Sequence, residues 1–126
     1  MSKFRNTITY LLPDGTTIGS KAKKILKPKE FIKFDSIKEL RRYRVLKKLE
    51  NVGRISELEL QPKYELQPKY TFRGENIRAI NYIADFRYIE NGVLITEDVK
   101  GMLTTEFKNK RKMLEYIYPE INLRLT

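Results

Sequence analysis

Two aspartates and a lysine in the second half of the chain have the types and spacing that metal-assisted phosphodiester chemistry requires. Asp85 follows Tyr82-Ile83-Ala84, and a single valine separates Asp98 from Lys100. Mg²⁺ prefers oxygen ligands and usually takes only one or two protein carboxylates. A lysine beside such a pair can orient an attacking water or stabilise negative charge on a phosphate. This trio is therefore the leading candidate for a reactive site.

Composition limits the other chemistry that the protein can use. The 126 residues include no cysteine and no histidine, which excludes a thiol nucleophile, an imidazole base and the usual zinc sites. Catalysis would then depend on carboxylates, lysines, hydroxyls or a metal ion held by oxygens. The net charge is +10, and residues 1–50 alone carry +9. Such a charge indicates a polyanionic partner, with simple solubility as the alternative explanation.

The chain length fits one domain of ordinary size. No segment approaches the roughly 18 apolar residues of a transmembrane helix. The first residues also lack the apolar centre of a signal peptide. We therefore expect a cytoplasmic protein with no membrane partner.

A predicted hairpin brings the two aspartates together. Asn91-Gly92 lies between strand-like segments at 77–90 and 93–100, which favours a two-residue type I′ turn. In that register Asp85 opposes Asp98, and Lys100 lies on the same face. Like charges directly opposed in a hairpin are destabilising, so a divalent cation between them would turn repulsion into attraction. The other face, which includes Tyr82 and Glu97, is mostly apolar and should pack on a helix.

Two helices are predicted beside this hairpin. The first runs from Ser36 to about Val52 and the second from Thr104 to about Tyr118. The first should bury an apolar side, and Glu39 shares that side, where it could supply a further metal ligand. The basic sides should neutralise the phosphates of a polyanionic partner such as DNA, without reading base sequence. Their side chains are Arg41, Arg44, Lys47, Lys48, Lys108, Lys110, Arg111 and Lys112.

The remaining segments complete the predicted order. Residues 1–33 read as a basic N-terminal arm or hairpin, and their lysine-rich second half is either a solvated linker or a phosphate contact. The hexamer Glu-Leu-Gln-Pro-Lys-Tyr occurs twice in succession over 59–70, and its prolines favour an edge or bulged strand. Residues 121–125 alternate as a final strand. Residues 34–126 thus form an α/β domain with a mixed sheet and the order αβββαβ.

The motifs at these positions resemble the PD-(D/E)XK nuclease superfamily, whose core has the order αβββαβ. The matching text is Ala84-Asp85, then Asp98-Val99-Lys100, with Glu39 as the helix carboxylate. Alanine stands where the motif has proline, and aspartate stands where glutamate is commoner. The chain also resembles a family of small phage- and prophage-borne proteins of poorly defined function. The blocks that carry this resemblance are Phe34-Asp35-Ser36, Leu60-Gln61-Pro62, Tyr82-Ile83-Ala84-Asp85-Phe86 and Glu97-Asp98-Val99-Lys100-Gly101.

The resemblance implies a restriction-endonuclease-like fold and an enzyme that hydrolyses DNA. Asp85, Asp98 and the Val99 carbonyl would hold Mg²⁺ or Mn²⁺, helped by Glu39, and Lys100 would assist the nucleophilic water. Members of this size are similar to phage endonuclease I-type Holliday junction resolvases. We therefore expect a homodimeric endonuclease that acts on branched DNA.

Several alternatives stay open at this point. Glu39 could complete a capping box with Ser36, Asp98 and Lys100 could form an exposed ion pair, and Asp85 could pair with Arg87. The enzyme could instead cleave linear duplex or single-stranded DNA. A third reading is a basic DNA-binding phage protein without catalytic activity.

Overall fold

The computed structural model describes residues 7–100 and 102–126, so Gly101 and the first six residues of the predicted arm lie outside it. Two compact units divide this part of the chain, one ending at Lys48 and the other spanning Leu49–Thr126. The predicted boundary lies earlier, between residues 33 and 34. The elements mix helices with strands in several sheets, as the predicted α/β class requires.

The N-terminal unit contains a small antiparallel sheet with the strand order β2-β1-β3. These strands are β1 (Thr9–Leu11), β2 (Thr17–Gly19) and β3 (Ile32–Phe34). The predicted turn at 13–15 joins β1 to β2, and Asp14 Oδ1 accepts a hydrogen bond from the Thr16 amide at 2.9 Å. Part of the lysine-rich stretch forms the short helix α1 (Ser20–Leu26), which ends before Pro28. Within the described residues 7–33, the predicted basic segment therefore forms two strands and a helix, and a linker follows α1 before β3 begins.

Helix α2 (Ile37–Asn51) follows the prediction closely. The Ser36 hydroxyl accepts a hydrogen bond from the Glu39 amide at 3.1 Å, which is one of the two bonds of a capping box. Glu39 is buried, as predicted, together with Leu40 and Leu46, whereas Val45 and Val52 are exposed.

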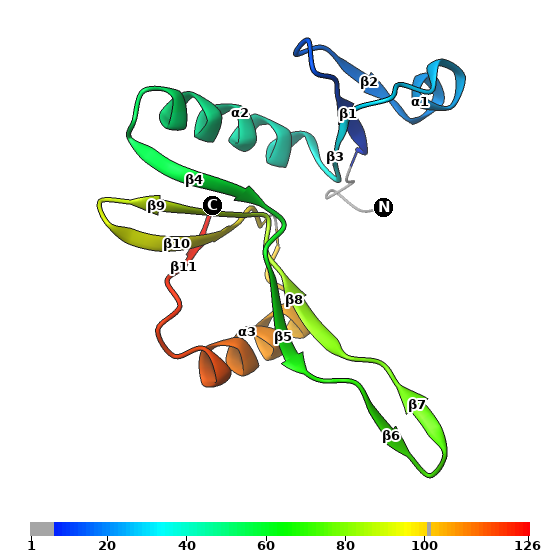
Figure 1. The fold of residues 1–126 in the computed structure, drawn as a ribbon, viewed down its shortest axis with the longest axis vertical. Coiled ribbons are helices and arrows are strands. Elements are labelled where there is room, and N and C mark those ends of the chain that lie inside the picture. The colour runs from blue at the N-terminus through cyan, green and yellow to red at the C-terminus, as the bar shows by residue number, and fades with distance from the viewer. Residues whose placement is uncertain (1–6, 101) are drawn as a thin grey trace. The chain divides into compact units, whose positions relative to one another are not determined.

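The C-terminal unit is built on a four-stranded sheet with the order β11-β10-β9-β4 (Figure 1). Its strands are β4 (Ile55–Leu60), β9 (Phe86–Glu90), β10 (Val93–Asp98) and β11 (Leu123–Leu125). Asn91 and Gly92 turn β9 into β10 with φ of 51° and 76°, which is the type I′ geometry that the sequence predicts. The ladder pairs Tyr88 with Ile95, which confirms the predicted register.

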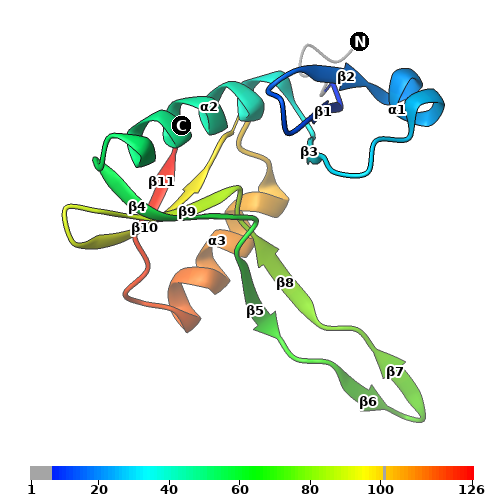
Figure 2. The same ribbon diagram turned by 45° about the horizontal axis from the view of Figure 1, so that its top comes forward.

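A two-stranded ribbon interrupts the sheet between β4 and β9 and projects from it (Figures 1 and 2). Its strands are β5 (Lys63–Gln67), β6 (Tyr70–Phe72), β7 (Glu75–Ile77) and β8 (Ile80–Ile83). From here on, 'the arm' means residues 63–83 and not the basic N-terminal segment of residues 1–33. The two hexamers cover the end of β4, β5 and the start of β6, and their prolines lie outside the strands, where no ladder hydrogen bond is lost. The predicted single strand over 77–90 is thus three strands.

Helix α3 (Thr105–Ile117) packs beside the base of the arm. The Thr104 side chain caps it by accepting from the Phe107 amide at 3.1 Å, and Pro119 follows its end. Phe107 and Leu114 form a core with Tyr82 and Ala84. After α3 the chain returns to add β11 parallel to β10. No helix in the described part of the chain has the length and apolarity needed to cross a membrane.

Candidate functional site

Asp85 lies where the arm meets the sheet. It belongs to the two-residue link between β8 and β9, and its amide contacts the Glu97 carbonyl at 3.1 Å. The chain leaves the sheet beside it, since the Gln61 amide donates to the Asp85 carbonyl at 3.0 Å and the Ala84 amide donates to the Pro62 carbonyl at 3.1 Å. Main-chain bonds on both sides therefore fix the position of Asp85.

Asp98 ends β10 and is held from the opposite side by the last residue of the chain. The Thr126 amide donates to the Asp98 carbonyl at 2.9 Å, and the Lys100 amide donates to the Thr126 carbonyl at 2.9 Å. These two bonds extend the parallel pairing of β10 with β11 beyond the strand ends. The Asp98 side chain is only 1% exposed, so its ion pair with Lys100 is not the exposed pair that the sequence left open.

The two carboxylates bind each other's backbone. The Asp85 amide donates to Asp98 Oδ1 at 2.9 Å, and the Val99 amide donates to Asp85 Oδ2 at 2.7 Å. Hydrogen bonds from amides to a carboxylate favour its ionised form. The hairpin register therefore brings Asp85 and Asp98 together as predicted, but their contact runs through amides rather than through directly opposed side chains.

Tyr82 and Lys100 complete the surroundings of Asp98. The Tyr82 hydroxyl donates to Asp98 Oδ2, and Lys100 Nζ lies 3.7 Å from the same oxygen. Burial raises the pKa of the Asp98 carboxyl above its ordinary value, and the charge of Lys100 and the Asp85 amide oppose that rise. Asp98 is therefore a buried acid whose ionised form depends on its partners.

Lys100 connects this buried pair to an open cleft. The cleft has a volume of about 220 Å³ and is lined by Tyr82, Ile83, Lys100, Thr104, Glu106, Phe107 and Lys110. Lys100 Nζ lies 4.6 Å from the centre of the Phe107 ring, which fixes the lysine across the start of α3. Lys110, one of the predicted DNA contacts, lines the same cleft and lies 3.7 Å from Glu106. A phosphate entering this cleft would meet two ammonium groups and the Glu106 carboxylate, and one of the ammonium groups, Lys100, is paired with Asp98.

The predicted metal ligands belong to both units. Asp85, Asp98 and Val99 meet within the C-terminal unit, whereas Glu39 belongs to α2 in the N-terminal unit. Over residues 7–100 and 102–126, no group of three or more acidic side chains has the arrangement of a metal site. Asp85 and Asp98 could offer a metal ion two protein carboxylates, with water or substrate oxygens at other positions.

Arg87, which the sequence left open as a partner of Asp85, pairs with Glu59. Its guanidinium binds Glu59 of β4, with Nη2 at 2.8 Å and 2.7 Å from the two carboxylate oxygens. This bidentate pair and a bond to the Tyr64 hydroxyl raise the pKa of Arg87 above its ordinary value. Arg87 thus joins β9 to β4 and to the base of the arm.

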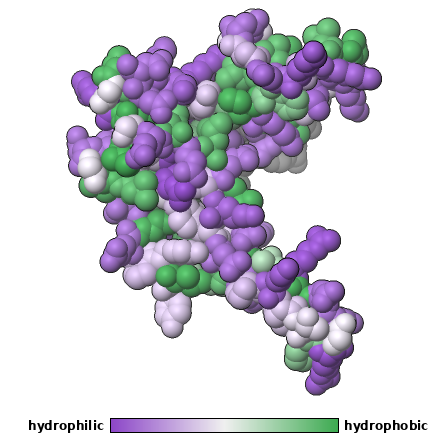
Figure 3. Space-filling model, in the orientation of Figure 1, coloured by the Kyte–Doolittle hydropathy of each residue, from purple (hydrophilic) through white to green (hydrophobic). Residues whose placement is uncertain are grey.

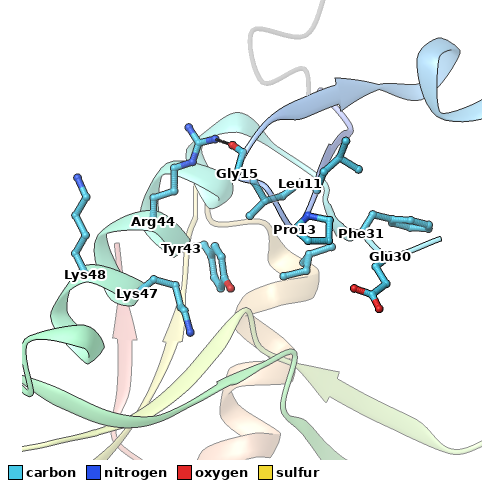
Figure 4. A pocket seen from close by; sticks show the side chains of 11 residues that line it. Leu11, Pro13, Gly15, Glu30, Phe31, Tyr43, Arg44, Lys47 and Lys48 are labelled. Atoms are coloured by element: carbon cyan, nitrogen blue, oxygen red, sulfur yellow. Dashed lines mark hydrogen bonds between the residues drawn. The ribbon is translucent and has the colours of Figure 1, made fainter. Parts of the chain in front are cut away.

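The predicted DNA contacts occupy two separate helices. On α3, Lys108 and Lys112 are exposed, and Arg111 Nε lies 3.4 Å from Glu115. On α2, Arg41 is exposed and Arg44 donates to the Gly15 carbonyl at 3.0 Å. Arg44, Lys47 and Lys48 also border a largely apolar hollow of about 500 Å³ in the N-terminal unit, to which Tyr43 and Phe31 contribute (Figure 4). Each helix therefore presents cations, as the sequence predicts.

Two residues that the sequence did not single out belong to this region. Tyr82 was expected on the apolar face, away from Asp85, yet its hydroxyl donates to Asp98. Strand alternation does not continue from Tyr82 to Asp85, because the chain breaks between β8 and β9. Glu97 was expected among apolar residues and is fully buried. It accepts from Tyr88 Oη at 2.5 Å and from Thr126 Oγ1 at 3.1 Å. Alternation along a strand predicts a face but not these polar partners.

One protein-family model, described as "Protein of unknown function (DUF1064)", matches residues 19–126. The match covers most of the chain, including both aspartates, the arm and both long helices. No curated protein and no solved structure matches the chain.

Proposed function

The chain belongs to the DUF1064 family, and we propose that it is a divalent-metal-dependent DNA endonuclease that works at Asp85, Asp98 and Lys100. The observation that carries this proposal is the reciprocal bonding of the two aspartates beside a cleft that Lys100 lines. Buried acidic groups with shifted pKa values, placed next to a cleft, are typical of functional sites. The resemblance of the sequence to PD-(D/E)XK nucleases implies a site at the same residues.

The donor set fits Mg²⁺ or Mn²⁺ held by few protein ligands. The residues that would hold the ion are Asp85, Asp98 and the Val99 carbonyl, and Mg²⁺ commonly takes one or two carboxylates while keeping water and substrate phosphate. Bound there, the ion supplies a water of lowered pKa and a positive charge for the phosphate. Glu39 as a further ligand stays a prediction.

Each of the chain's own residues then has a separate task. The Asp85 and Val99 amides keep the two carboxylates in one orientation, so little reorganisation is needed when substrate arrives. Lys100 extends from Asp98 into the cleft, where its ammonium can orient a water or stabilise the charge that develops on the phosphate. No histidine is present in the chain to act as a base.

DNA is the substrate that the charge distribution favours. The net charge is +10, and exposed cations lie on both α2 and α3, which suits contacts to phosphates without base selection. Branched DNA and a homodimeric enzyme are the finer part of the proposal. They rest on the resemblance to phage resolvases, with linear duplex and single-stranded DNA as the other substrates to be tested.

A DNA-binding protein without catalytic activity is the second candidate. One observation favours it: both Asp98 oxygens have protein partners, and burial makes the ionised carboxylate costly. On this reading the aspartates would serve only to join β10 to the base of the arm. The basic helices would serve the same role as in the nuclease.

Cleavage assays with purified protein separate these possibilities. A labelled four-way junction and its matched linear duplex would each be incubated with Mg²⁺, Mn²⁺ or EDTA. Asp98→Asn is the test variant, and Asp14→Asn, at an exposed turn, controls for the change in charge. We expect junction cutting that needs metal and falls at least about 100-fold in Asp98→Asn. Equal cutting of both substrates would remove the resolvase part, and binding without cleavage under every condition would leave the second candidate.

A further inference from the structure

The outer end of the arm is a slender two-stranded ribbon. β6 and β7 pair through Tyr70–Ile77, Thr71–Asn76 and Phe72–Glu75, and together they form a sheet of two strands only (Figures 1 and 2). Every residue of β6 is exposed, as are Arg73, Gly74 and Glu75. A ribbon of this kind buries little apolar surface, so its residues are not explained by core packing.

The turn at the tip of the arm places Arg73 in a backbone conformation that arginine rarely adopts. Arg73 and Gly74 form a two-residue turn with φ of 49° and 82°, the type I′ geometry also found at Asn91-Gly92 in the same chain. That geometry requires positive φ at both positions and favours asparagine, aspartate or glycine at the first. The β9–β10 hairpin follows this preference and the arm does not. Arg73 is therefore a cation at an exposed tip where the turn itself would favour asparagine or glycine.

Aromatic and cationic side chains gather around that turn. Phe72 is 56% exposed and Tyr70 is 47% exposed, and the two lie on the same face of β6. The Arg73 guanidinium lies 5.1 Å from the centre of the Phe72 ring. This end of the arm has three exposed cations and one exposed acidic residue, Glu75. The cations are Lys69, Arg73 and Arg78. Figure 3 shows the arm as largely hydrophilic, with small hydrophobic areas toward its tip.

We propose that the β6–β7 end of the arm binds the major groove of duplex DNA and that Arg73 makes its principal contact with the DNA phosphates. This inference rests on the proposed action on DNA and names an element that would grip the duplex. Paired strands lie about 4.8 Å apart, so with side chains they exceed a minor groove about 6 Å wide and fit a major groove about 12 Å wide. Phe72 is suited to contact thymine methyl groups there.

The charge at the tip argues against a second copy of the chain as the occupant. A symmetric dimer contact places the same patch of both subunits together, so three cations on each side would meet, with only one acidic residue, Glu75, on each side to offset them. Like charges brought together in this way are unfavourable, whereas phosphates on both sides of a groove match them. The arm therefore fits DNA better than it fits itself.

Arg73→Asn is a precise test because asparagine suits the turn. The substitution removes the cation while placing a favoured residue at positive φ, so the arm should fold at least as well as in the wild type. Lys27→Asn is the matched control, since Lys27 is also an exposed cation with positive φ, at the end of α1. A urea unfolding curve for each variant verifies that both remain folded.

Binding would be measured by fluorescence anisotropy of a labelled duplex in EDTA, where cleavage cannot occur. We expect Arg73→Asn to bind the duplex about tenfold more weakly than wild type. The slope of log affinity against log salt concentration should decrease by the equivalent of about one phosphate contact. Lys27→Asn should have a smaller effect on both quantities. Wild-type protein should also protect guanine N7 from dimethyl sulfate, and Arg73→Asn should lose that protection. N7 lies in the major groove, so the footprint reports the groove itself.

Three results would overturn the proposal: affinity of Arg73→Asn within about twofold of wild type, unchanged N7 protection, or a dimer without DNA that Arg73→Asn dissociates. Failure of the nuclease is distinguishable from failure of the arm. Wild-type protein that binds through Arg73 but never cleaves would refute only the nuclease. Wild-type protein that cleaves, with Arg73→Asn binding normally, would refute only the arm.

Discussion

The carboxylates of Asp85 and Asp98 are linked through two backbone amides. The Asp85 amide binds Asp98 Oδ1 at 2.9 Å, and the amide after Asp98 binds Asp85 Oδ2 at 2.7 Å. Neither carboxylate can turn without breaking a bond that positions its neighbour. The pair therefore acts as one rigid group where the arm, β9 and β10 converge.

Asp98→Asn should change how stability depends on pH in metal-free protein. Burial raises the folded-state pKa of Asp98 above the ordinary 3.8, so the folded protein retains a proton that the unfolded chain has lost. The stability from the protonated carboxyl is fully present below about pH 3.8 and is lost as pH rises through the folded-state pKa. The free energy of unfolding of wild type minus that of Asp98→Asn should therefore fall with rising pH.

Urea unfolding of both proteins in EDTA across this range is the measurement. Asparagine keeps an oxygen for the Asp85 amide, so the variant should remain folded. Groups that titrate far from Asp98 contribute equally to both curves and cancel in the difference. A difference that stays constant or grows with pH would show that Asp98 is not a buried acid of raised pKa.

Tyr82→Phe should destabilise the protein by about 1–2 kcal/mol, because a buried carboxylate oxygen loses its hydroxyl donor. Tyr70→Phe is the matched control: its ring is 47% exposed on the arm, and its free energy of unfolding should stay within about 0.5 kcal/mol of wild type. Urea unfolding at neutral pH compares the two. Equal effects in both variants would contradict the role given to the Tyr82 hydroxyl.

The hairpin was predictable because its signals are local. Asn91-Gly92 sets the turn and the turn sets the register, so the neighbourhood of Asp85 and Asp98 follows from two residues. Ser36 and Thr104 likewise begin the two long helices by capping them. These features need no knowledge of distant parts of the chain.

The break at Ala84-Asp85 could not be read from the sequence in the same way. No glycine or proline marks it, and residues 77–90 alternate as one strand would. The burial of Asp98 depends on the partners it meets there, Tyr82 and Lys100, and on the return of Thr126 beside β10. Such contacts join distant segments, and strand alternation carries no information about them.

Lys100→Gln should separate catalysis from binding. Lys100 adjoins the aspartate pair, so we expect the cleavage rate to fall by about 10- to 100-fold while duplex affinity in EDTA changes by less than about threefold. Lys110→Gln, which alters the other ammonium of the same cleft, should weaken affinity with little effect on the rate at saturating DNA. Single-turnover cleavage and anisotropy measure the two quantities. Equal rate losses in both variants would assign Lys100 a general electrostatic role only.

The central claim is that Asp85 and Asp98 hold a divalent ion, and Mn²⁺ binding followed by electron paramagnetic resonance tests it most directly. Titration of Mn²⁺ into wild type, Asp85→Asn, Asp98→Asn and the exposed control Asp14→Asn would give the bound fraction for each. We predict saturable binding in wild type and Asp14→Asn, with a loss of at least about tenfold in affinity in the two site variants. Wild-type binding that Asp85→Asn and Asp98→Asn leave unchanged, or no binding in any protein, would contradict the account.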